Sequence, residues 1–176
     1  MVRVAIGFGA NLGDRRAHLD AGLGALSVWG KPISRSALYE SEPVGPVEQE
    51  PFLNAVAVFE TNESPAGVLK RLLDIELSRG RTRDVRWGPR TLDLDLLLYG
   101  DQEVAEPGLT VPHPELTNRR FVLEPLLEAW PDASMPDGTR LGTFLAGVQD
   151  QEVRRVGEWH VGWWKRLGWQ FRAAIR

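Results

Sequence analysis

Residues 90–99 read RTLDLDLLLY. Because alternate side chains of a β-strand share a face, this stretch predicts a strand with leucines toward the core and with Asp93 and Asp95 on the opposite face. The rise of a strand puts the two aspartate Cα atoms about 7 Å apart. The pattern therefore indicates a sheet with one face buried. The leucines expected to enter the core together are Leu92, Leu94, Leu96 and Leu98.

The sequence on either side predicts more strands, with helices between them. Asp14 and Ser64 are suitable helix N-caps, and Pro65 suits a first helical position. Strands and helices without strict βαβα alternation favour an α+β sandwich with a mostly antiparallel sheet. The expected strands cover 2–8, 34–41, 54–61, 92–99 and 109–111, and the expected helices begin after Asp14, at Pro65 and near Phe121.

Composition limits the function classes. The 176 residues suit one domain, and a formal net charge of -3 argues against a nucleic-acid partner. No apolar run approaches the ~20 residues that span a bilayer, so no membrane partner is expected. The N-terminal sequence gives no sign of a signal peptide. The absence of cysteine excludes disulfides and thiol chemistry and fits the cytoplasm.

The paired aspartates are candidate metal ligands. Two carboxylates on one strand face repel each other and stay ionised best beside a cation. Magnesium is typically bound by one or two carboxylates together with substrate phosphates, so Asp93 and Asp95 suit a magnesium–nucleotide site. A solvated polar strand face is the alternative interpretation of these two residues.

An arginine cluster precedes the aspartates. Five arginines fall within residues 79–90, opposed only by Asp84. Guanidinium groups bind phosphate oxygens bidentately, so the cluster next to paired carboxylates predicts a polyphosphate site. Alone, it would indicate a solvated face or a weak nucleic-acid patch. Gly88 and Pro89 beside Trp87 predict a lid with a hinge.

Other segments are less specific. The glycines of residues 7–13 do not match G-x-G-x-x-G, and the chain contains no P-loop motif, so a tight turn is the simpler interpretation. His113 lies between prolines and is either a phosphate contact or an ordinary histidine. Phe52 and Asn54 could hold a flat heterocycle, or Phe52 could be core.

The run GRTR at 80–83, followed by RWGPRTLDLD at 86–95, closely resembles the signature of the 6-hydroxymethyl-7,8-dihydropterin pyrophosphokinases of folate biosynthesis. Those enzymes convert ATP and a pterin alcohol into AMP and the pterin diphosphate. The resemblance spans roughly residues 1–145 and implies a ferredoxin-like fold. Similar segments are residues 9–13, 42–46, 52–54 and 109–121.

The resemblance also implies roles for individual residues. Asp93 and Asp95 would bind two magnesium ions, and Arg81 and Arg83 would act in catalysis from a mobile lid. The ATP-binding residues would be Glu76, Arg81, Arg83, Arg90, His113 and Arg119. The pterin-binding residues would be Ser41, Val44, Phe52, Asn54, Trp87 and Phe121, with the two phenylalanines on opposite faces of the ring.

Two other functions would explain part of this pattern. A nucleotide-sensing or RNA-binding domain would explain the arginines but not the carboxylates, which repel phosphate without a metal. A two-metal nuclease would usually need more carboxylates. Formation of AMP rather than ADP from ATP distinguishes all three.

Residues 151–176 are expected to be a Trp-rich tail beside a catalytic domain of residues 1–150. Apolar residues at near four-residue spacing predict a helix there, weakened by glycines. Docking on the protein's own body is favoured over a membrane or a partner, and a monomer is expected. The stripe consists of Val156, Trp159, Trp163, Leu167 and Phe171.

Overall fold

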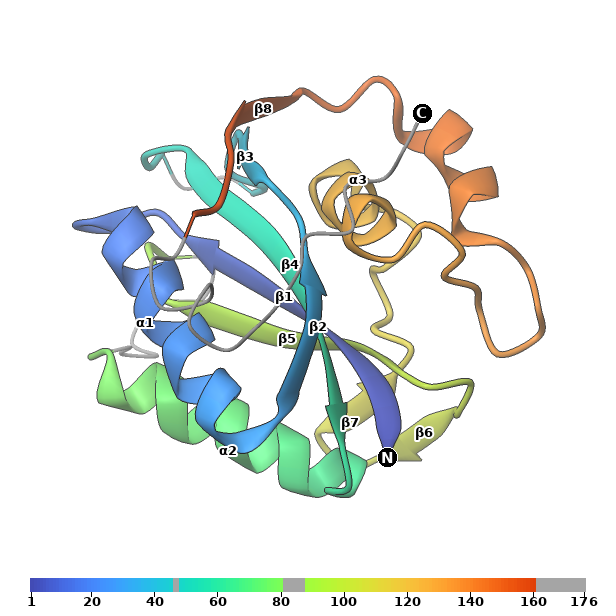
Figure 1. The fold of residues 1–176 in the computed structure, drawn as a ribbon. Helices are drawn as coiled ribbons and strands as arrows, with labels where there is room; N and C mark the ends of the chain where they lie inside the picture. The colour runs from blue at the N-terminus through green and yellow to red at the C-terminus, as the bar shows by residue number, and fades with distance from the viewer. Residues whose placement is uncertain (46–47, 81–87, 161–176) are drawn as a thin grey trace.

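A six-stranded sheet lies at the centre of the computed structural model, which describes residues 1–45, 48–80 and 88–160 (Figure 1). Its strands are β1 (Val2–Ala10), β2 (Lys31–Arg35), β3 (Leu38–Ser41), β4 (Phe52–Thr61), β5 (Asp93–Tyr99) and β8 (Val153–Gly157). The order is β5-β1-β4-β3-β8, with β2 also paired to β4, and these pairings are antiparallel. A separate hairpin joins β6 (Val104–Glu106) and β7 (Leu109–Val111).

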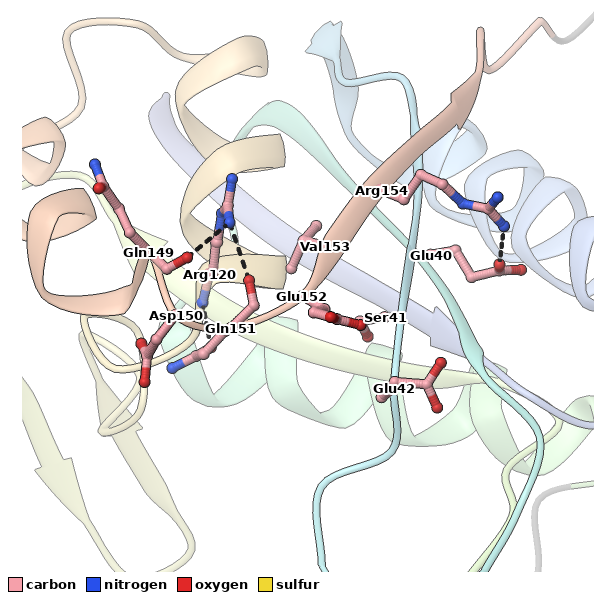
Figure 2. Close-up of a pocket in the computed structure, with 10 residues that line it drawn as sticks. All are labelled: Glu40, Ser41, Glu42, Arg120, Gln149, Asp150, Gln151, Glu152, Val153 and Arg154. Atoms are coloured by element: carbon pink, nitrogen blue, oxygen red, sulfur yellow. Dashed lines mark hydrogen bonds and ion pairs between the residues drawn. The ribbon is translucent and has the colours of Figure 1, made fainter.

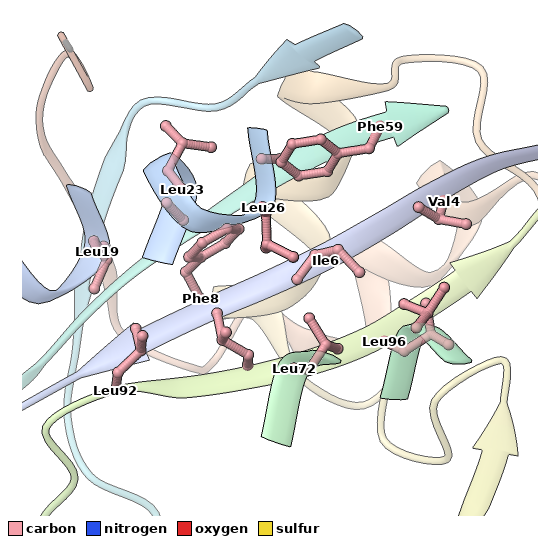
Figure 3. Close-up of a cluster of buried hydrophobic side chains, with 14 of the residues drawn as sticks. Val4, Ile6, Phe8, Leu19, Leu23, Leu26, Phe59, Leu72, Leu92 and Leu96 are labelled. Atoms are coloured by element: carbon pink, nitrogen blue, oxygen red, sulfur yellow. The ribbon is translucent and has the colours of Figure 1, made fainter. Parts of the chain in front are cut away.

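Helices cover both faces of the sheet. The helices are α1 (Arg15–Trp29), α2 (Pro65–Ser78) and α3 (Arg120–Ala129), with the 3-10 helix η1 (Leu141–Val148) after them. The first two bury leucines against one face in the cluster shown in Figure 3, while α3 and η1 form a second cluster. The predicted α+β, ferredoxin-like sandwich is confirmed. Within the described residues no helix has the length and apolar content needed to cross a bilayer.

Both predicted helix starts are confirmed by their caps. The side chain of Asp14 accepts a hydrogen bond from the backbone of Ala17 at 3.0 Å, and Ser64 accepts one from Gly67 at 3.2 Å. Each bond satisfies a first-turn N–H group that has no partner within its helix. These caps fix where α1 and α2 begin.

The leucine alternation in β5 holds only to Leu96. Leu92, Leu94 and Leu96 join the α1–α2 cluster as expected, but Leu98 packs in the α3 cluster. The pairing of β1 with β5 shifts register between Ala5 and Ile6, next to this point. Such an irregularity reverses the faces of the residues beyond it, so the prediction for Leu98 was wrong.

The strand expected over 34–41 is two strands, β2 and β3, interrupted at Ser36 and Ala37. The hydroxyl of Ser36 accepts a hydrogen bond from Val56 N at 3.0 Å and donates one to Ala37 O at 2.7 Å. Ala37 N donates to the carboxylate of Glu128 on α3 at 2.8 Å. Side-chain hydrogen bonds therefore replace part of the backbone pairing between β2 and β3. One of them connects this interruption to α3.

The helix expected in the tail is wrong for Val153–Gly157, which forms β8 and pairs with β3. Trp159 follows and is buried, 1% exposed, with its ring edge-on to Phe8 at a centroid distance of 5.1 Å. Its indole N–H donates to Asp20 of α1 at 2.7 Å. Residues 153–160 therefore complete the sheet and its core. Trp163, Leu167 and Phe171 lie outside the described residues.

We predict that Trp159→Ala lowers the free energy of unfolding by about 3–5 kcal/mol, the usual effect of truncating a buried aromatic side chain. The matched control is Val156→Ala in β8, because Val156 is exposed. Urea unfolding monitored by circular dichroism measures both. A loss for Trp159→Ala no larger than the control's would show that Trp159 does not anchor this segment.

Candidate active site

Two glycines of β1 lie between the paired aspartates and β4. In the β1–β5 register Gly9 faces Asp93 and Gly7 faces Asp95, and on its other side Gly9 faces Asn54. Directly opposite residues in an antiparallel pair share a face. A Cβ atom placed on Gly9 would lie 3.5 Å from the Asn54 Oδ1 atom and 3.9 Å from the Asp93 Cβ atom. The missing side chain therefore leaves a gap between carboxylate and amide.

The same sheet face is closed at its other end. There α3 packs on Ala5, Val56 and Val58 in the second buried cluster. Beyond Val56 along β4, the residues on this face are Asn54 and Phe52. The candidate site is thus the end of this sheet face that α3 does not cover, and none of the described helices packs on it.

The two aspartates have different surroundings. Asp93 forms an ion pair with Arg90, and its side chain is 15% exposed. Asp95 is 41% exposed, and its Oδ1 atom is 4.0 Å from the Nε2 atom of His113. Both carboxylates therefore have a basic side chain beside them, and Asp95 is the more exposed of the two.

The conformation of His113 directs its Nε2 atom at Asp95. The His113 Nδ1 atom accepts a hydrogen bond from Glu115 N at 3.1 Å, and His113 N donates to Leu97 O at 3.0 Å on β5. Burial lowers the pKa of His113, and the Arg119 guanidinium lowers it further. The neutral ring therefore carries its proton on Nε2, because Nδ1 is the acceptor.

Glu76 is buried, 2% exposed, at the C-terminal end of α2. Its Oε1 atom accepts a hydrogen bond from Leu94 N at 2.7 Å. Among the described strands β5 is at the edge of the sheet, so one side of its backbone has no neighbouring strand there to bind. Glu76 thus fixes the backbone of β5 between Asp93 and Asp95.

Asn11 is a functional candidate that sequence reasoning missed. Its buried amide donates to the side chain of Gln49 at 2.9 Å and to Glu50 O at 3.0 Å. Its Oδ1 atom accepts from Arg90 N at 2.8 Å, and its backbone N–H donates to Arg90 O. Asn11 therefore links the segment before β5 to the segment before β4. In the sequence it stands within a glycine-rich turn that is part of the family resemblance, and no role was assigned to it there.

Among the expected pterin residues, Ser41, Phe52 and Asn54 lie on the paired strands β3 and β4, and Phe121 lies on α3. Asn54 is buried and donates to the Ser41 hydroxyl at 2.9 Å, while Phe52 lies beside Gly9. Neither Phe52 nor Phe121 belongs to the two buried clusters of the described chain, so Phe52 is not ordinary core. Val44 is 55% exposed in the loop after β3.

The first residues of α3 bring a positive charge to the site. The Arg119 guanidinium lies over the Phe121 ring at 5.8 Å. Arg119 also acts electrostatically on His113, which in turn lies beside Asp95. The start of α3 therefore lies near His113, which is beside Asp95 in the first half of β5.

Some expected site residues fall where the structure gives no description. Arg81, Arg83 and Trp87 lie in residues 81–87, outside the described chain. Within the described ranges there is no cluster of three or more metal-binding side chains. Two carboxylates, Asp93 and Asp95, are therefore the donors that this part of the site offers.

Comparison with known proteins identifies the family. The family model for 7,8-dihydro-6-hydroxymethylpterin-pyrophosphokinase (HPPK) matches residues 5–131. This range runs from within β1 to just after α3. The chain belongs to the HPPK family.

Individual relatives agree with this assignment. A 2-amino-4-hydroxy-6-hydroxymethyldihydropteridine pyrophosphokinase of Pseudomonas aeruginosa is 43% identical over 156 residues, covering 88% of this chain and 96% of its own. The protein of the same name from Haemophilus influenzae is 42% identical over 158 residues, covering 89% and 99%. A crystal structure of Plasmodium falciparum HPPK-DHPS superposes with a TM-score of 0.65 at 14% identity. The match covers 83% of this chain and 44% of that chain. At this level of identity it shows a shared fold only.

The contact between Glu76 and β5 gives a testable prediction. We expect Glu76→Ala to lower the free energy of unfolding by about 1–3 kcal/mol, because Leu94 N loses its acceptor. Glu76→Gln is the control, since its carbonyl can still accept that bond. Urea unfolding followed by tryptophan fluorescence compares them. Equal losses in both variants would show that the charge of Glu76, and not this hydrogen bond, contributes to the free energy of unfolding.

Proposed function

We propose that this chain transfers the pyrophosphoryl group of ATP to 6-hydroxymethyl-7,8-dihydropterin, giving AMP and the pterin diphosphate. Membership of the HPPK family supports the reaction class. The observation that carries the proposal is the pairing of Asp93 and Asp95 with Gly9 and Gly7, beside Asn54. This arrangement offers carboxylates for a metal–polyphosphate complex next to an amide for a heterocycle.

Asp93 and Asp95 are the proposed magnesium ligands. Magnesium commonly takes one or two protein carboxylates and completes its coordination with water and substrate phosphates, so this two-carboxylate donor set suits it. When bound, two such ions would neutralise developing charge on the attacking and leaving oxygens. Arg90 forms an ion pair with Asp93 and so places a positive charge beside this proposed donor.

The remaining residues would bind and orient the two substrates. Arg90, His113 and Arg119 are proposed to contact the triphosphate, with Arg81 and Arg83 closing over it in catalysis. Fixed guanidinium groups would stabilise charge that develops on the transferred group. Glu76 would act beside the nucleotide by holding β5 in place.

The pterin is proposed to lie over Gly9 of β1, between Asp93 and Asn54. Asn54, held by Ser41, would bind its polar edge, and Val44 would contribute from the loop after β3. Phe52 and Phe121 would enclose the ring, with Trp87 closing over it. The pterin hydroxyl oxygen would then attack the β-phosphorus in line with the departing AMP, so positioning supplies much of the catalysis.

We further propose that residues 1–150 form the catalytic part of a domain whose sheet and core are completed by residues 153–160, and that the protein acts as a monomer in the cytoplasm. Every proposed substrate contact falls within residues 1–150. The absence of cysteine suits a reducing compartment.

Product analysis tests the proposed reaction directly. Incubation with ATP, magnesium and 6-hydroxymethyl-7,8-dihydropterin is expected to give AMP and the pterin diphosphate in equal amounts. The control omits the pterin. Formation of ADP, or of AMP without any need for pterin, would contradict the proposal.

Asp95→Asn is expected to abolish most turnover while the protein stays folded, because a neutral amide is a poor magnesium ligand. Asp93→Asn should behave in the same way. The rate of AMP formation is measured at saturating substrates, with circular dichroism as the check on folding. Near-normal turnover in either folded variant would exclude these aspartates as metal ligands.

Phe121→Ala is expected to weaken pterin binding by roughly 1–3 kcal/mol, the scale for losing one aromatic wall of a base-like ring. The affinity for ATP should change little. Calorimetric titration of each ligand measures both values. A comparable loss of ATP affinity would show that Phe121 supports the structure instead of contacting the pterin.

A further inference from the structure

The start of α3 is held by a segment far away in the sequence. The N-cap residue of α3 is Arg119, whose side chain makes no capping hydrogen bond. The first-turn N–H groups of a helix need partners from elsewhere. The Arg120 N–H group finds one in the side-chain carbonyl of Gln151, at 2.9 Å. Gln151 therefore caps the helix from a distance of 31 residues along the chain.

The same side chain makes a second backbone contact. Gln151 Nε2 donates to Asn118 O at 2.8 Å. The two bonded groups, Asn118 C=O and Arg120 N–H, belong to the peptide units on either side of Arg119. One side-chain amide therefore fixes the backbone both before and after Arg119.

Arg120 holds Gln151 in return. One of its guanidinium nitrogens donates to Gln149 O at 3.1 Å and to Gln151 O at 3.0 Å, as Figure 2 shows. The Nε atom of Arg120 is bonded to Glu124, one turn along α3, at 2.7 Å. We call these reciprocal bonds between Arg120 and the turn 149–151 the α3 clasp.

The clasp adjoins the proposed substrate site. It forms one wall of a cavity of about 640 Å³ that is also lined by Ser41, the residue bonded to Asn54 (Figure 2). Arg119 and Phe121 are the immediate chain neighbours of Arg120, and the Arg119 guanidinium lies over the Phe121 ring. A shift of the backbone at residue 119 would therefore move both side chains.

We propose that Gln151 is a positioning residue for substrate binding: its amide fixes the backbone around Arg119 and so holds Arg119 and Phe121 where the two substrates meet. This proposal rests on the proposed function, which gives Phe121 to the pterin and Arg119 to the triphosphate. It assigns a role in the site to the segment that follows residue 150. Gln151 acts through these neighbours and needs no contact with either substrate.

Calorimetry of pterin binding tests the proposal, with 6-hydroxymethyl-7,8-dihydropterin titrated in the presence of saturating α,β-methylene-ATP and magnesium. Gln151→Ala removes both bonds and is expected to raise the pterin Kd roughly five- to tenfold, the scale for losing one or two hydrogen bonds. Gln151→Glu keeps the acceptor but loses the donor to Asn118 O, so a rise in the same direction is expected. The matched control is Gln149→Ala, whose exposed side chain is removed while its carbonyl group remains; its Kd should equal that of the wild type.

A double-mutant cycle separates positioning from plain stabilisation. If Gln151 acts through Phe121, Gln151→Ala should have little further effect on the pterin Kd in a Phe121→Ala background. A Kd within twofold of wild type for Gln151→Ala, with only a lower melting temperature, would overturn the proposal. So would an effect that persists in full without Phe121. If Gln151→Ala does not fold, Gln151→Glu decides by the same criteria.

Wild-type behaviour distinguishes this proposal from the function on which it rests. A wild-type chain that neither binds the pterin nor forms AMP would contradict the proposed function itself. A wild-type chain that does both, with Gln151 variants of unchanged affinity, would overturn the role of Gln151 alone.

Discussion

The register between β1 and β5 is the constraint on which the proposed site depends. It sets Asp93 and Asp95 opposite Gly9 and Gly7, on the face that α3 leaves uncovered at this end. A slip of one residue would turn the aspartates toward the leucine core beneath α1 and α2. The burial of Leu92, Leu94 and Leu96 against those helices opposes such a slip. Packing on one face of the sheet therefore determines which residues lie on the other face.

Polar contacts around β5 then hold this arrangement in place. Glu76 binds the backbone at Leu94, and His113 binds it at Leu97. Asn11 ties the segment before β5 to the loop before β4. These contacts come from three separate segments and meet at or just before β5. Within the described residues β5 is an edge strand, whose backbone groups on one side need partners other than a strand. The same need for backbone partners underlies the capping of α3 by Gln151.

Local sequence pattern was sufficient for much of the fold. The alternation of residues 92–96 predicted both the core face and the aspartate face, and Asp14 and Ser64 predicted helix starts that the caps confirm. Leu98 was misplaced because its face depends on a register irregularity in the pairing with β1, which no local pattern encodes. The start of the tail, at Val156, was mistaken for a helix because β8 becomes a strand by pairing with β3, more than a hundred residues away.

The candidate site was predicted unevenly for the same reason. Asp93 and Asp95 stand out through their spacing, and the arginines through their clustering. Asn11 and Gln151 act through hydrogen bonds to backbone groups 30 or more residues away, so their type and position carry little signal in one sequence. The residues proposed to contact substrates are thus easier to predict here than the residues that hold them in place.

Counting bound metal ions tests the central claim most directly. Mn²⁺ is titrated into the protein with α,β-methylene-ATP and followed by electron paramagnetic resonance, for the wild type and for Asp93→Asn. A two-metal site on the open face of β5 predicts two Mn²⁺ ions per chain in the wild-type complex and a loss of tight Mn²⁺ binding in the folded variant. Equal number and affinity of Mn²⁺ ions in the two proteins would contradict it.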